Sequence, residues 1–348
     1  MEVDLPDTSY RLHHVEDLWF DDGDIVLQAG VAQYRVYRVV LGMHSPVFKD
    51  MLAFPQPPDS ELVEGQPLVV LQDLEVEVTA FLRALFEPEF FPAFPAMTNF
   101  TTIYGCIRLG NKYSVDFLLR RGLVHLSSRF MTSLTRFDAS ARGDHEGLYT
   151  PEFTEQKPAN EIVSWKPPLD RSFLICVIAL AREVDALWIL PNAFYDLTFH
   201  FDALQDNIFH ENLFDGVIPV VLSRKEQREW VVGFEDQIST TADIVRFLTY
   251  PPVIDGCLTP SKCPLVRFRA ADYGRQMISS FSRGPLSAWA EDDWDKLQKL
   301  CPVCMKKLRE LHQEARRTFW EDLPDIYRLP PWTELLKLKQ AVIGDILA

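Results

Sequence analysis

From Asp24 onward, short runs of β-forming residues alternate with amphipathic stretches. The runs IVLQ (25–28) and YRVYR (34–38) are separated by AGVAQ, so the pattern predicts a hairpin of two strands. The extended pattern of the second run continues through YRVYRVVL to residue 41, and LVVL (68–71) predicts a third strand. Between them, FPQPPDSELVEGQP (54–67) is rich in proline and is expected to be a loop. These patterns predict a small sheet.

A helix is predicted within GMHSPVFKDMLAF (42–54). A serine side chain accepts hydrogen bonds from the free N–H groups of a first helical turn, and proline suits the first helical position, so Ser45 and Pro46 indicate its start. Apolar residues then fall on one side of the helix and are expected in the core: Val47, Phe48, Met51 and Leu52. Further core-facing helices are expected around residues 78–85, after Thr98 as a cap, and from Ser114 onward.

The stretch 131–168 loses this periodicity and gains proline, glycine and charge, so we expect an exposed linker, with Phe153 and Trp165 as the side chains that would dock. Beyond Leu169 almost every periodic segment is helical. The predicted fold class is therefore α+β, with an N-terminal tail (1–16), a unit of sheet and helices (17–130), the linker (131–168) and a mainly α-helical C-terminal domain (169–348).

Two details of the C-terminal domain follow from local patterns. Ser223 and Glu226 have the spacing of a capping box, which predicts a helix start before KEQREWVVGF. In FWEDLPDIYRLPPWTELL the prolines are expected to break the helix, once at Pro324 and again at Pro330 and Pro331.

Charge and hydropathy narrow the classes of partner. The formal net charge of −15 repels phosphate backbones, so a direct nucleic-acid partner is not expected. No run approaches the roughly 18–20 apolar residues of a membrane helix, and the N-terminus lacks the pattern of a signal peptide. We therefore expect no membrane partner and an intracellular location, in the cytoplasm, the nucleus or both.

Four of the six cysteines form two pairs, Cys257-x5-Cys263 and Cys301-x2-Cys304. Four thiolates can hold a zinc ion in a tetrahedral structural site. Two other interpretations stay open, which are four reduced thiols without metal, and a redox pair formed by the CPVC sequence at a helix start. Cys106 and Cys176 lie on apolar helical faces and are expected in the core.

Motifs of catalysis are scarce. The chain has no G-x-S-x-G, no phosphate-binding loop and no G-x-G-x-x-G. We therefore expect no enzyme activity and no small-molecule substrate.

The first unit resembles the BTB/POZ domain over roughly residues 17–126. The resemblance lies in DGDIVL (22–27), YRVYRVVLGMHSPVFKDML (34–52), LVVLQDLEVEVTAFLRALF (68–86) and IRLGNKYSVDFLL (107–119). The whole chain looks like the BTB-domain proteins abundant in fungi. The resemblance implies a noncatalytic protein-interaction module that forms homodimers, and a helical domain that binds other proteins. It also implies that Asp24 and Arg38 meet in a charged pocket at the dimer interface.

The chain departs from the family at two places. Tyr37 stands where the family has a histidine, before the basic residue. Some BTB proteins serve as substrate adaptors of cullin-RING ubiquitin ligases through a hydrophobic-x-Glu motif, but here Phe54 is followed by prolines 55 and 57. The adaptor function and a CxxC thiol oxidoreductase are therefore kept as alternatives to a plain interaction scaffold.

Overall fold

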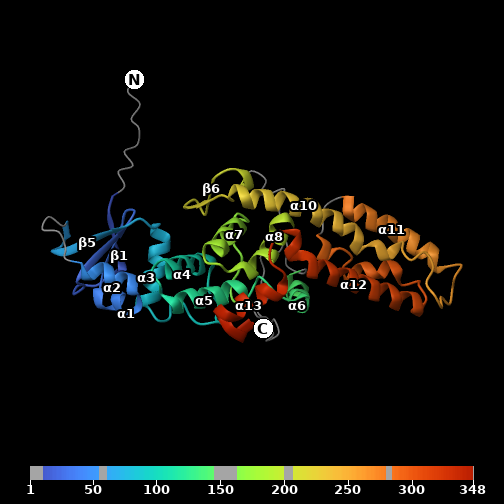
Figure 1. Ribbon diagram of the computed structural model, residues 1–348, viewed down its shortest axis with the longest axis horizontal. Helices are drawn as coiled ribbons and strands as arrows, with labels where there is room; N and C mark the ends of the chain where they lie inside the picture. The colour runs from blue at the N-terminus through green and yellow to red at the C-terminus, as the bar shows by residue number, and fades with distance from the viewer. Residues whose placement is uncertain (1–10, 55–60, 145–162, 200–206, 280–283, 348) are drawn as a thin grey trace, which may run out of the picture.

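The computed structural model describes residues 11–54, 61–144, 163–199, 207–279 and 284–347. The molecule is elongated, with a small sheet at one end and helices α11 and α12 at the other (Figure 1). Buried apolar residues of the sheet, of the helices behind it and of the C-terminal helices belong to one continuous core. The described part is thus a mixed structure of the α+β class with a small sheet and many helices.

The sheet has five strands in the order β1-β3-β2-β5-β4. Strands β2 and β3 pair antiparallel with Leu27 opposite Tyr34, and β5 runs parallel to β2. Gly30, with a φ of 57°, lies in the tight turn between β2 and β3, where a residue without Cβ is favoured. The strand bounds are β1 His13–Trp19, β2 Ile25–Ala29, β3 Ala32–Val36, β4 Leu62–Val63 and β5 Gln66–Leu71. The predicted hairpin and third strand are confirmed.

Part of the predicted loop at 54–67 is strand. Residues 55–60 lie outside the described residues, but β4 pairs antiparallel with β5. Glu64 and Gly65 both have positive φ, at 49° and 80°, as a two-residue hairpin turn of type I′ requires. The loop prediction is therefore wrong for residues 62–63 and 66–67.

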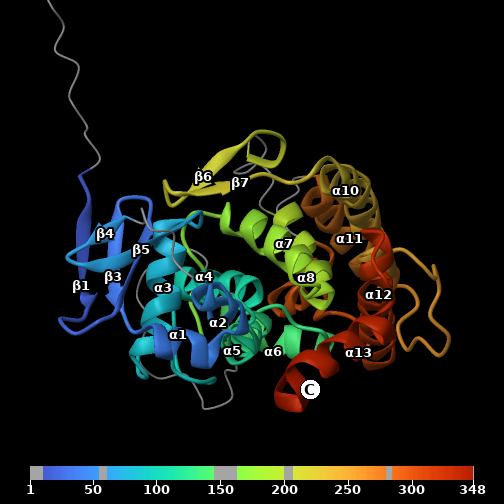
Figure 2. The ribbon, with the colours of Figure 1, turned by 60° about the vertical axis from the view of Figure 1, so that its left-hand side comes forward.

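Five helices follow or cover the sheet (Figure 2), namely α1 Arg38–His44, α2 Pro46–Ala53, α3 Glu75–Phe86, α4 Phe100–Lys112 and α5 Asp116–Ser127. Helix α2 begins as predicted, because the Ser45 hydroxyl accepts from the N–H of Phe48 and Pro46 takes the first position. The Phe48 side chain is buried, with its ring centroid 4.5 Å from that of Tyr113. Val47 is 38% exposed, so its predicted place in the core is wrong.

The extended pattern does not continue to residue 41, because α1 begins at Arg38. A carboxylate oxygen of Asp24 accepts from the N–H of Arg38 at 2.7 Å. The backbone N–H of Arg38 is one of the donors that a first helical turn leaves without a partner. Its acceptor, Asp24, precedes both strands of the hairpin. The helix start therefore depends on a contact that the local pattern does not contain.

One predicted cap and one predicted helix start lie before the observed positions. Asn99, not Thr98, caps α4 by accepting from the N–H of Thr102. Ser114 has a φ of 54° and α5 begins only at Asp116. The helix predicted around residues 78–85 corresponds to α3, in which Val78, Phe81 and Leu82 are buried as expected.

The segment 131–168 is not an exposed linker where it is described. Residues Leu134–Asp144 form helix α6, and Trp165 is buried with its indole N–H donating to the carbonyl of His125 at 2.8 Å. Phe153 lies outside the described residues. The stretch lacks helical periodicity in its sequence because polar residues occupy most of α6.

The remaining chain is mainly helical, as predicted. In its described parts the α-helices are α7 Phe173–Glu183, α8 Leu190–Phe199, α10 Arg224–Ile244, α11 Cys263–Ser279, α12 Pro302–Ile326 and α13 Trp332–Ile343. Short 3-10 helices lie at η1 Leu187–Ile189, η2 Arg246–Leu248, η3 Pro285–Ser287, η4 Glu291–Leu297 and η5 Gly344–Leu347. Strands β6 Asn212–Phe214 and β7 Ile218–Val220 form a separate hairpin. The capping box of Ser223 and Glu226 is present at the start of α10.

The predicted break at Pro324 is wrong, since α12 continues to Ile326. Proline lacks an N–H, so Pro324 leaves the carbonyl of Trp320 without its usual helical donor. The indole N–H of Trp332 donates to this carbonyl at 2.6 Å. A side chain from α13 thus replaces the missing bond, while the break at Pro330 and Pro331 is confirmed by the start of α13 at Trp332.

Within the described ranges, the search for a helix with the length and apolar content of a membrane span found none.

Candidate metal centre

The four paired cysteines lie at the ends of helices or in a turn at the end of the molecule opposite the sheet. Cys257 follows Gly256, which has a φ of 74°, and its N–H donates to the carbonyl of Ile254. Cys263 is the first residue of α11. Cys301 is the N-cap of α12 and Cys304 lies in its first turn. Proline at position 302 suits the first turn of that helix.

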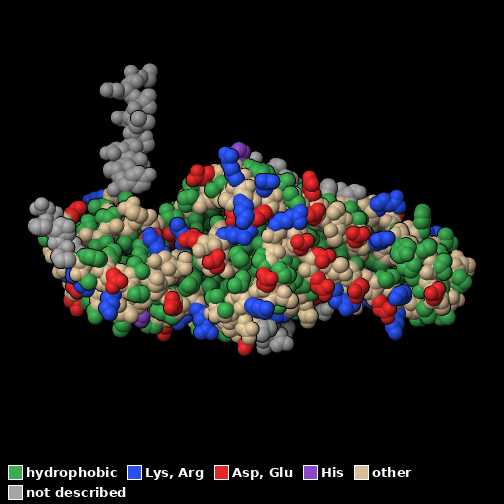
Figure 3. Space-filling view, viewed as in Figure 1, with side chains coloured by type: hydrophobic (Ala, Val, Ile, Leu, Met, Phe, Trp, Pro, Cys, Tyr) green, Lys and Arg blue, Asp and Glu red, His purple; other side chains and the backbone are tan. Residues whose placement is uncertain are grey.

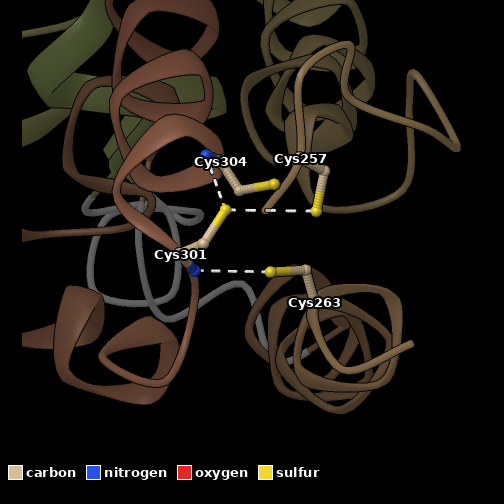
Figure 4. A group of neighbouring side chains, drawn as sticks. All are labelled: Cys257, Cys263, Cys301 and Cys304. Atoms are coloured by element: carbon tan, nitrogen blue, oxygen red, sulfur yellow. Dashed lines mark hydrogen bonds between the residues drawn. The ribbon is translucent and has the colours of Figure 1, made fainter. Parts of the chain in front are cut away.

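The four side chains converge (Figure 4). All four sulfur atoms lie within 4.8 Å of one another, and the sulfurs of Cys257 and Cys301 are 4.0 Å apart. Four sulfurs at tetrahedral positions, each about 2.3 Å from a zinc ion, lie about 3.8 Å from one another. The observed spacing therefore needs only small adjustments of side chains to hold one ion. All four thiols are free rather than joined in disulfides.

Backbone N–H groups point at the sulfurs. The N–H of Cys301 donates to the sulfur of Cys263 at 3.3 Å, and that of Cys304 donates to the sulfur of Cys301 at 3.5 Å. The Thr259 hydroxyl lies 3.0 Å from the sulfur of Cys263. Such donors stabilise the thiolate over the thiol, which is the form that binds a metal.

Burial and hydrogen bonding act on these thiols in opposite directions. The N–H of Cys304 lowers the pKa of the Cys301 thiol to about 6. Burial raises the pKa of Cys304, and it also raises that of Cys257. A bound cation would reverse the effect of burial, because a thiol that coordinates a metal is deprotonated.

A buried arginine accompanies the cluster. Arg267 lies one helical turn after Cys263 on α11 and is only 4% exposed. Its guanidinium donates to the carbonyl of Phe247 at 2.9 Å. Burial lowers the pKa of Arg267, while negative charge on Cys304 and Cys263 acts to raise it. The sequence shows that Arg267 follows Cys263 by four residues. Only the fold brings it close enough to Cys304 for the charge of that cysteine to act on it.

The sequence-based pair of Asp24 and Arg38 is also brought together, at the sheet end of the molecule. The Arg38 Nε lies 3.5 Å from a carboxylate oxygen of Asp24, and its guanidinium donates to the backbone carbonyl of Asp24 at 3.0 Å. The side chains are 37% and 52% exposed, respectively. Tyr37, which replaces the expected histidine, donates its hydroxyl to Asp22 at 2.5 Å. The pair therefore lies at the surface of a single chain.

The two remaining cysteines are core residues, as predicted. Cys106 in α4 and Cys176 in α7 are buried among apolar side chains. Burial raises the pKa of both thiols. Neither is among the four cysteines whose sulfurs converge.

Comparison of the chain with protein-family models, with characterised proteins and with solved structures found no match. The fold and the cysteine cluster therefore carry the functional argument.

Proposed function

We propose that this chain is a noncatalytic interaction protein whose N-terminal unit is a BTB-type self-association module and whose C-terminal helices bind another protein. The proposal is supported by the presence of a hairpin, two short helices, a strand parallel to the first hairpin strand and further helices, in this order along the chain. A structural zinc ion held by the four cysteines stabilises the helical end of the molecule.

The observation that carries self-association is the surface beside the Asp24–Arg38 pair. On α1, which Arg38 begins, Val39 is 72% exposed and Met43 is 70% exposed. These side chains are four residues apart and therefore lie on the same face of the helix. Neighbouring exposed apolar side chains mark interaction surfaces, and charged groups such as this pair are typical of the polar rim around them.

The test is the oligomeric state at tens of micromolar, a concentration at which specific dimers with Kd values of about 1 µM or below are populated. Light scattering is expected to give a dimer for the wild type and a monomer for Met43→Asp. Reversal of Asp24 to arginine is expected to weaken the dimer, because it places like charges side by side. Leu336→Asp, at an exposed apolar position of α13, is the matched control and should remain dimeric. A monomeric wild type would refute self-association.

The zinc proposal is supported by the donor set. Four cysteine sulfurs leave no position for water or substrate, which is the composition of structural rather than catalytic zinc sites. The ion would join the turn at Cys257 and the start of α11 to the start of α12, segments that are far apart in the sequence. The zinc content of the purified wild type and of cysteine variants tests which residues hold the ion, without assuming any activity.

The two alternatives have less support. A thiol oxidoreductase needs a reactive sulfur that its substrate can reach, whereas Cys301 and Cys304 are 6% and 1% exposed. The cullin adaptor function lacks its motif, although Phe54 is 73% exposed. A pull-down with a purified cullin separates the adaptor from the plain scaffold.

A further inference from the structure

The end of the molecule that carries the cysteines has an apolar surface with a basic rim. We name it the tip surface and define it by apolar side chains at Tyr250, Val253, Leu258, Leu265 and Phe268, and by basic ones at Lys262, Arg269, Lys299 and Lys306. Figure 3 shows hydrophobic side chains gathered at this end, with Lys and Arg around them. We propose that the tip surface binds an acidic amphipathic segment of a partner protein.

The apolar part of this surface is unusual for a helix of a soluble protein. Helix α11 buries Cys263, Arg267 and Ala270 on its inner face. On its outer face Leu265 is 62% exposed and Phe268 is 70% exposed. In the segment before α11, Val253 is 69% exposed and Leu258 is 66% exposed. Clustered exposed apolar residues mark interaction sites more often than single ones do.

The net charge of this end is weakly positive, in contrast to that of the whole chain. Residues 246–279 and 284–312 contain ten Lys and Arg and seven Asp and Glu, in a protein with a formal net charge of −15. Among the described residues, four exposed basic side chains of this region form no ion pair: Lys262, Arg269, Lys299 and Lys306. Charges left unpaired at the edge of an apolar area favour a partner with acidic groups around apolar ones.

The negative charge on the rest of the chain favours a small acidic partner over an extended one. A membrane or a nucleic acid presents an extended anionic surface, which the acidic remainder of this molecule repels. A short helical segment can place its apolar side chains on Leu265 and Phe268 and its carboxylates near Lys262 and Arg269 without facing the rest of the chain. The inference rests on the proposed binding of another protein by the C-terminal helices, for which it names the chemistry of the partner, and it does not use self-association.

The experiment measures binding of three fluorescein-labelled amphipathic helical peptides that carry Leu and Phe on one face and Glu on the other. Fluorescence anisotropy with the full chain is expected to show binding that weakens with salt. Leu265→Ser/Phe268→Ser should lower the affinity by more than about tenfold, as loss of central apolar anchors does. Lys262→Glu/Arg269→Glu should do the same.

Matched controls exclude general effects. Leu336→Ser/Leu338→Ser changes exposed apolar residues of α13, and Lys49→Glu/Lys337→Glu changes exposed basic residues elsewhere. Both should bind like the wild type, and peptides with Lys in place of Glu should not bind to the tip surface. All variants are surface changes, so circular dichroism should show the wild-type fold.

Four results would overturn the proposal. They are the absence of peptide binding, an equal loss in the control variants, binding only to phosphatidylserine-containing vesicles, and a change of oligomeric state in the tip variants without peptide binding. The third would assign the surface to a membrane and the fourth to a second copy of the chain.

Discussion

The two ends of the molecule differ in how completely they bury their apolar side chains. At the sheet end, strands β2 and β3 are almost completely buried, and Phe48 and Phe81 pack with Tyr113 behind them. The opposite end, residues 246–279 and 284–312, which we call the distal lobe, has a small aromatic core around Phe247 and leaves much apolar surface exposed.

The comparison indicates what each end needs to stay folded. The sheet end buries enough apolar surface to be stabilised by the hydrophobic effect. In the distal lobe four cysteines from separate segments lie close together, and small units with such a cluster are commonly stabilised by a metal ion. We therefore expect the distal lobe, and not the sheet end, to depend on metal.

The largest expected effect is loss of a cysteine ligand. Structural zinc in zinc-finger peptides binds with about 10–16 kcal/mol, so Cys304→Ala should unfold the distal lobe or strongly loosen it. Hydrogen exchange should rise across residues 246–312 and remain unchanged in β2, β3 and α4. Cys176→Ala is the matched control, because Cys176 is also a nearly fully buried thiol, at 2% exposure. It should cost only about 1–2 kcal/mol, as small core truncations do. Equal effects of the two variants would contradict the metal site.

The next largest effect concerns the sheet end. Phe48→Ala should lower the free energy of unfolding by about 3–5 kcal/mol, because the ring is fully buried. Val47→Ala, at the neighbouring exposed position, should change it by less than about 1 kcal/mol. Chemical denaturation followed by circular dichroism measures both, and an unchanged midpoint for Phe48→Ala would refute the assigned packing.

A smaller effect is expected from His312 in the distal lobe, which should make the free energy of unfolding depend on pH. His312 is buried, and its Nε2 lies 3.2 Å from the carbonyl of Ala288. Burial lowers the pKa of His312 to about 4, with Arg309 and Arg316 acting in the same direction and Asp138 of α6 opposing them.

The unfolded chain then takes up the proton more readily than the folded chain, so stability falls as pH decreases from about 6.5 to about 4. Between pH 8 and pH 5 the loss attributable to His312 should be about 2 kcal/mol. His312→Gln should remove this part of the pH dependence. The difference between the two proteins excludes contributions from the cysteines and from His125, whose pKa burial also lowers. Identical pH profiles would contradict the prediction.

The smallest effect is expected for the Asp24–Arg38 pair. Both side chains are exposed, so Arg38→Ala should change the free energy of unfolding by less than about 1 kcal/mol. Its effect on self-association should be larger than its effect on stability. Thermal unfolding and light scattering on the same samples separate the two, and a large loss of stability would show that the pair supports the fold instead.

The local parts of the fold could be predicted from the sequence, whereas the long-range ones could not. Ser45 with Pro46, and Ser223 with Glu226, identify helix starts because the capping atoms lie within three residues of the groups that they cap. The start of α1 escaped prediction because its donor is satisfied by Asp24, fourteen residues earlier. The continuity of α12 through Pro324 likewise depends on Trp332, in another helix.

The same distinction applies to the metal centre. The spacing of Cys301 and Cys304 indicates two sulfurs that can reach one ion, since the pair occupies a helix start. That Cys257 and Cys263 meet them depends on how α11 packs near α12, which no local pattern specifies. The electrostatic interaction of Arg267 with the cluster could not be recognised from the sequence either, because it involves Cys263 and Cys304, which belong to separate segments.

The most direct test of this account is the metal content of the purified protein. Elemental analysis should use full-length chain that has never been exposed to a chelator or to a metal-affinity column. We expect about one zinc ion per chain, as a single four-cysteine site requires, and about none in Cys304→Ala after dialysis. Zinc well below one equivalent in the wild type would contradict the zinc site and leave the four cysteines as free thiols.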